Sequence, residues 1–67
     1  MPTYTVLTIN NALGTTHFCG KFDTIEEAAD YARTQAERSR SFAEFVVYLG
    51  TPKNWDQATD RRFKGTK

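Results

Sequence analysis

Two side chains that could act together as a nucleophile and its base, His17 and Cys19, stand two residues apart. Alternate residues of a strand share a face, so the thiol and the imidazole would be neighbours in an extended segment. A catalytic Cys–His pair also needs an orienting group and an oxyanion hole, and no motif supplies either. A zinc site needs about four ligands, which one histidine and one cysteine cannot provide. We therefore predict no catalytic, metal-binding or cofactor-binding residues and expect a non-enzymatic protein.

A second group with chemical potential is acidic and comprises Glu26, Glu27 and Asp30. A carboxyl group that acts as a general acid needs a buried environment. These three side chains fall on the polar side of a helical pattern whose other side is lined by alanines. They are better explained as a solvated face and as partners of the positive end of the helix dipole.

Length and composition set the limits for any function. The chain has 67 residues, of which 39% are hydrophobic and 25% charged. This composition fits one small folded domain rather than a disordered chain. With a single cysteine the chain can form no internal disulfide, and residues 1–4 lack the basic and apolar run of a signal peptide. No stretch approaches a membrane span. We expect a cytoplasmic protein.

The net charge of +1 conceals an uneven distribution. Residues 23–38 carry five acidic side chains and two arginines, whereas residues 53–67 carry five cationic side chains and two aspartates. Such a bipolar molecule can orient itself against a charged partner.

The clearest local signal is the sequence Thr24-Ile25-Glu26-Glu27. Thr24 can accept a hydrogen bond from the backbone N–H of Glu27, and the Glu27 carboxylate can reach back to the N–H of Thr24, which is a capping box. The apolar residues that follow have helical spacing and extend the helix to about Arg38; they are Ile25, Ala28, Ala29, Ala32 and Ala36.

Three segments have the β-branched and aromatic composition of strands: residues 4–9, 15–22 and 42–49. The turn at 10–14 makes the first two a hairpin, and Gly20 suggests a bulge. We predict an α+β fold, a small antiparallel sheet of order β-β-α-β along the chain with one helix on one face. Residues 1–52 would form this core. Residues 53–67 would be a basic C-terminal extension of the same domain or a partly flexible one, with a helical turn at 54–60, a short fourth strand at 61–64 and loose final residues.

One helix covers one face of such a sheet. On strand 42–49 the apolar set of Ala43, Phe45, Val47 and Leu49 should meet it, and on the first strand Leu7 and Ile9. The opposite face would then carry Tyr4, Val6, His17, Cys19, Phe42, Val46 and Tyr48. An aromatic face of that size is either covered or used. Trp55 and Phe63 could fold across it, or it could dock a protein or stacked bases.

The predicted contact surface combines aromatic side chains, which supply desolvated anchors, with cations that pair with carboxylates or phosphates. Its residues are Tyr4, Phe42, Tyr48, Trp55, Arg61, Arg62 and Lys64. Whether this surface or the acidic helix is the working one stays open.

Residues 18–49 contain the end of a strand pair, the segment Phe22-Asp23-Thr24-Ile25-Glu26-Glu27-Ala28-Ala29-Asp30-Tyr31-Ala32, and the strand Phe45-Val46-Val47-Tyr48-Leu49. This pattern resembles small phage-encoded host-takeover inhibitors, such as the T7 early inhibitor of bacterial RNA polymerase and small anti-CRISPR proteins. The resemblance implies a compact protein-binding inhibitor that acts in the cytoplasm of a bacterial host on a protein or nucleoprotein complex. The alternative is a small nucleic-acid-binding protein that uses the aromatic face and the basic tail.

Overall fold

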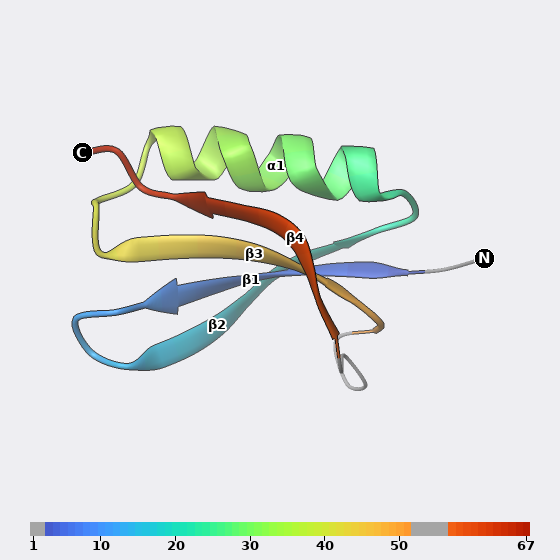
Figure 1. Ribbon diagram of the computed structural model, residues 1–67, viewed down its shortest axis with the longest axis horizontal. Coiled ribbons are helices and arrows are strands. Elements are labelled where there is room, and N and C mark those ends of the chain that lie inside the picture. Colours follow the sequence, from blue (N-terminus) through green and yellow to red (C-terminus); the bar gives the residue numbers. More distant parts are fainter. Residues whose placement is uncertain (1–2, 52–56) are drawn as a thin grey trace.

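A computed structural model describes residues 3–51 and 57–67. One helix lies along one side of a twisted sheet (Figure 1), as the predicted α+β class requires. The elements in chain order are β1 (Tyr4–Asn10), β2 (Thr15–Phe22), α1 (Ile25–Glu37), β3 (Ala43–Leu49) and β4 (Gln57–Lys64).

The sheet has the strand order β2-β1-β3-β4, and every neighbouring pair is antiparallel. β2 and β3 flank β1 and therefore run parallel to each other. A parallel relation requires a long crossover connection, usually a helix, and α1 supplies it. This topology makes β1 and β3 central and leaves β2 and β4 at the two edges.

The β1–β2 hairpin turns through a side-chain-supported loop. The Asn10 Oδ1 atom accepts hydrogen bonds from the backbone N–H groups of Ala12 and Leu13, both at 3.0 Å. Gly14 closes the turn with a φ of 71°, in the left-handed region that glycine enters without steric cost. The predicted turn at 10–14 therefore has a specific chemical cause.

A bulge interrupts the pairing of β2 with β1. Val6 pairs with Gly20 and Leu7 pairs with Phe18, so Cys19 is an extra residue on β2. A bulge changes which side chains share a face. Phe18 and Phe22, four residues apart, would share a face of a regular strand, but the bulge sends them to opposite faces.

The helix begins at the predicted N-cap, Thr24, but the Glu27 carboxylate contacts the Thr24 hydroxyl instead of the predicted backbone N–H. Thr24 has an extended backbone, and its hydroxyl oxygen accepts from the Glu27 backbone N–H at 3.2 Å. The same hydroxyl donates to the Glu27 carboxylate at 3.2 Å. At the other end Arg38 is the C-cap, and the Ser39 hydroxyl donates to the carbonyl oxygen of Gln35 at 2.7 Å.

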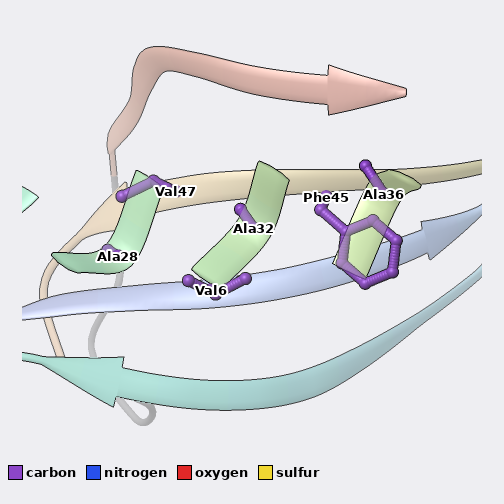
Figure 2. Close-up of a cluster of buried hydrophobic side chains, with 6 residues drawn as sticks. All are labelled: Val6, Ala28, Ala32, Ala36, Phe45 and Val47. Atoms are coloured by element: carbon purple, nitrogen blue, oxygen red, sulfur yellow. The ribbon is translucent and has the colours of Figure 1, made fainter. Parts of the chain in front are cut away.

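The core lies between α1 and one face of the sheet (Figure 2). Its fully packed members come from α1, β1 and β3: Val6, Ala28, Ala32, Ala36, Phe45 and Val47. The alanines recur every four residues and so form one line on the helix. Phe45 and Val47 face the helix as predicted, whereas Leu49 is 37% exposed and is not part of this cluster.

The prediction for the facing of the first strand is wrong. Val6 packs against α1 and Tyr4 lies against the same cluster, so Leu7 and Ile9 point to the other side. Both sets of alternate residues on β1 include large apolar side chains, so alternation alone could not choose between them. The pairing of Val6 with Val47 decides the facing.

The fourth strand is longer than predicted. The helical turn expected at 54–60 is wrong for residues 57–60, which belong to β4; residues 54–56 lie outside the described part of the chain. β4 supplies hydrogen-bond partners for the edge of β3, and the Thr59 hydroxyl also donates to the Val47 carbonyl oxygen at 2.8 Å. Residues 57–60 have no strong local preference for helix or strand, so the hydrogen bonds gained by pairing with β3 decide their conformation.

The final residues are held in place, in contrast to the loose end that we expected. Backbone hydrogen bonds join Gly65 to Ala43 at 2.8 Å, Lys67 to Ser39 at 3.0 Å and Ser41 to Lys67 at 2.7 Å. Figure 1 shows the C-terminal residues beside the end of α1.

Substitution of the helix cap tests the start of α1. Thr24→Ala should lower the free energy of unfolding by about 1 kcal/mol because the N-cap hydrogen bond is lost. Thr34→Ala is the matched control, since Thr34 is exposed inside α1. Thermal unfolding followed by circular dichroism measures both, and an equal effect of the two substitutions would contradict the capping role.

Truncation of the largest core side chain tests the helix-facing side of β3. Phe45 is 6% exposed and Phe42 is 43% exposed. Phe45→Ala should cost about 3–5 kcal/mol, which approaches the whole stability of a small domain. Phe42→Ala should cost less than about 1 kcal/mol. Urea unfolding of both variants gives the comparison, and a stably folded Phe45→Ala variant would overturn the assigned packing.

Candidate binding surface

The face of the sheet away from α1, here called the outer face, follows from the strand register and from the alternation of side chains along each strand. It is formed by all four strands. Its members are Thr5, Leu7 and Ile9 of β1, Thr16, Phe18 and Lys21 of β2, Glu44, Val46 and Tyr48 of β3, and Arg62 and Lys64 of β4.

The outer face is arranged in rows that cross the strands. The middle row runs Phe18, Leu7, Val46, Arg62. Leu7 is 2% exposed and Val46 is fully buried, whereas Phe18 is 55% exposed. The side chains of Leu7 and Val46 are therefore not accessible to a partner. Phe18 is the exposed aromatic ring of this row.

Cations surround this apolar centre. Arg62 pairs with Glu44, with 3.4 Å between Nε and Oε2, and Glu44 also accepts from the Asn11 amide at 3.4 Å. Within the described part of the chain, Lys21 and Lys64 form no ion pair. The outer face therefore has an excess of positive charge at its rim.

Three of the residues predicted for the contact surface meet on the outer face, namely Tyr48, Arg62 and Lys64. Tyr4 packs on the helix side of the sheet. Phe42 precedes β3 in a turn, where its carbonyl oxygen accepts from the Asn11 N–H at 2.9 Å.

The remaining predicted contact residues come from the C-terminal part of the chain. Arg61 lies where the register of β4 against β3 shifts and has no partner on β3; its guanidinium lies 3.7 Å from the Asp60 carboxylate. Trp55 lies outside the described residues. Phe63, one of two residues considered as a cover for this face, packs instead against the helix-side core.

Sequence reasoning missed Phe18 and Lys21. It placed His17 and Cys19 on the face away from the helix, which assigned Phe18 to the core side. The bulge reverses this assignment: Cys19 packs on the core cluster, and His17 pairs with Thr8, on the same face as Val6. Gly20 was the available signal, since a glycine inside a strand often marks such a bulge.

The Cys19 thiol is partly buried and packs against the core cluster. Burial raises the pKa of Cys19, against a smaller opposing effect of a backbone hydrogen bond from Thr8. A reactive cysteine instead needs a lowered pKa and an accessible position. The described residues contain no pocket and no group of three or more His, Cys, Asp or Glu side chains placed to hold a metal ion.

The acidic residues of α1 form a separate surface. Glu26, Glu27 and Asp30 are all exposed. Asp30 accepts from the Arg33 guanidinium at 2.9 Å, with both side chains more than half exposed. Pairs of this kind contribute little to stability, so this surface is a solvated face that stays available for contact.

Comparisons with known proteins identified no relative of this chain. No protein-family model, curated protein or solved structure matches the chain. No helix among the described residues has the length and the apolar character to cross a membrane.

A glycine fixes the basic end of the chain beside β3. Gly65 is buried, and a Cβ atom there would overlap the carbonyl oxygen of Arg40. Gly65→Ala should therefore displace residues 65–67 and lower the free energy of unfolding by about 1–3 kcal/mol.

The control for this substitution is Gly20→Ala, whose Cβ would meet only the Phe22 ring, at 3.3 Å. A ring can shift more easily than backbone, so this variant should lose less stability. Amide hydrogen exchange should become faster at Ser41 and Lys67 in the Gly65 variant alone. Unchanged exchange at both positions would show that the glycine is not required there.

Proposed function

We propose that this chain is a non-enzymatic protein-binding module whose contact surface is the outer face of the sheet. The observation that carries the proposal is the exposed ring of Phe18, in one row with the Arg62 guanidinium and beside the Lys21 cation. An exposed aromatic side chain among cations is the composition of an interface anchor with a polar rim.

The partner that fits this surface has an apolar patch with carboxylates around it. Lys21 and Lys64 lie on different strands at opposite ends of the outer face, so they can pair with acids on both sides of the patch. Complementary charge of this kind favours specificity and the rate of association.

A narrower form of the proposal is inhibition of a machine of a bacterial host, such as RNA polymerase or a CRISPR effector complex. Its support is the resemblance of residues 18–49 to small phage-encoded host-takeover inhibitors. A likeness of fold is a weaker argument for function than the chemistry of a surface, so the outer face carries the main proposal.

A second candidate function is binding of single-stranded nucleic acid. The observation that favours it is the presence of Phe18 and Tyr48 on the same face as Lys21, Arg62 and Lys64. Aromatic rings can stack on bases while cations neutralise phosphates.

Capture of a partner from bacterial lysate, with and without nuclease, separates the two functions. A protein partner should be retained after nuclease treatment. Its affinity should depend weakly on salt, whereas affinity for nucleic acid should fall steeply with salt in proportion to the phosphates contacted.

Substitutions on the outer face should weaken binding to the captured protein. Phe18→Ala and the double variant Arg62→Ala with Lys64→Ala should each reduce affinity by about ten-fold or more, equivalent to about 1.4 kcal/mol. Phe42→Ala is the matched control, because Phe42 is an exposed phenylalanine outside the outer face. Isothermal titration calorimetry measures the affinities, and circular dichroism confirms the fold.

A third variant tests the acidic helix. Glu26→Lys with Asp30→Lys should leave the affinity nearly unchanged. Loss of binding in this variant, with retention in the outer-face variants, would assign the contact to α1 and refute the proposed surface.

A further inference from the structure

The two edges of the sheet differ in how they are protected from further strand pairing. An edge strand presents unpaired backbone N–H and C=O groups, and natural proteins cover such edges with charged side chains. β4 carries Asp60, Arg61, Arg62 and Lys64. It also lies beside α1, as Figure 1 shows.

Residues 15–18 of β2 lack charged side chains, and the bulge of this strand, which can also hinder edge pairing, begins only at Cys19. Within the described part of the chain, the only strand neighbour of β2 is β1. Residues 15–20, with the sequence TTHFCG, carry no acidic, lysine or arginine side chain. Residues 15–18 are all exposed, and threonine and phenylalanine favour strands. Lys21 is the single lysine or arginine of β2 and follows the bulge.

We propose that β2 pairs with β2 of a second copy of this chain, antiparallel about a two-fold axis near His17. The two four-stranded sheets would then form one continuous sheet. This inference goes beyond the proposed function and does not depend on it.

Charge is the argument for a second copy. A two-fold axis brings each residue near it against its own symmetry mate, so a lysine or an acid near the axis would face an identical charge. Thr16, His17 and Phe18 place no lysine, arginine or acid there. With the axis near His17, Lys21 lies opposite the β1–β2 turn of the second copy. That turn, residues 11–14, carries no charge.

The same argument disfavours self-pairing of β4 about an axis at Arg61 or Arg62. Such an axis would bring these two arginines close to their own symmetry mates, and like charges opposite each other destabilise strand pairs. Pairing of β2 with β4 of the next molecule would set two strands of net positive charge side by side. It would also be head-to-tail and would not close into a dimer.

Sedimentation equilibrium tests the proposal over protein concentrations from about 1 µM to about 1 mM. The unmodified chain should shift reversibly from monomer to dimer. At the high concentration, amide hydrogen exchange should slow within β2 and stay unchanged in β4. A chain that is monomeric over the whole range would overturn the proposal, as would slower exchange confined to β4 or α1.

A matched pair of substitutions adds one lysine at each of two exposed threonines. Thr16→Lys places the new charge near the proposed axis, whereas Thr34→Lys places it on the exposed side of α1. Both variants have the same net charge, so overall repulsion is equal. Thr16→Lys should weaken the dimer by at least about ten-fold, and Thr34→Lys should leave it unchanged. Equal dissociation constants of the two variants would refute pairing through β2.

Discussion

Ala28, Ala32 and Ala36 have no side-chain atoms beyond Cβ, so α1 can lie close to Val6 and Val47 of the sheet. This contact provides most of the packed core, since α1 is the one helix among residues 3–51 and 57–67. All three alanines are at most 3% exposed. A larger side chain at any of them would have to displace the helix or the sheet, because protein interiors have no spare volume. The single-sided packing also explains why the sheet has an outer face.

The bulge at Cys19 distributes the aromatic side chains between the two faces. Phe22 packs near Tyr31 of α1, with ring centroids 5.2 Å apart, and Phe18 emerges on the outer face. Without the extra residue both rings would compete for the helix side, and the outer face would lose its exposed ring. The single extra residue at the bulge therefore places Phe22 in the core, where it stabilises the fold, and Phe18 on the outer face, where it is available for contact.

The parts of the fold with strong local signals could be predicted from the sequence. The capping box of Thr24 and Glu27 fixed the start of α1, and the alanine spacing identified its buried side. The facing of β1 could not be predicted, because both of its faces contain apolar residues and the choice depends on pairing with β3. For the same reason the full length of β4 was missed: residues 57–60 have weak local preference and become a strand by pairing with β3.

The residues predicted for contact share the proposed surface only in part. Tyr48, Arg62 and Lys64 share the outer face, and alternation along β3 was sufficient to place Tyr48. Tyr4 was misplaced with the facing of β1, and Phe18 was missed because the bulge changes the register. Residues that depend on long-range pairing are thus the ones that sequence patterns assign least well.

The central position of β1 also has a kinetic consequence. Its hairpin with β2 closes a short loop, whereas its contacts with β3 join distant parts of the chain; the Thr5 hydroxyl bonds to the Gly50 carbonyl oxygen 45 residues away. Closing a loop of that length costs roughly 3 kcal/mol of chain entropy before the contacts repay it. The hairpin and α1 involve mainly local contacts, so we expect the search that brings β3 to β1 to limit the rate of folding. During that search both sides of the β1–β2 hairpin are unpaired, so the rate at which β3 arrives sets how long its apolar strand is exposed to other chains.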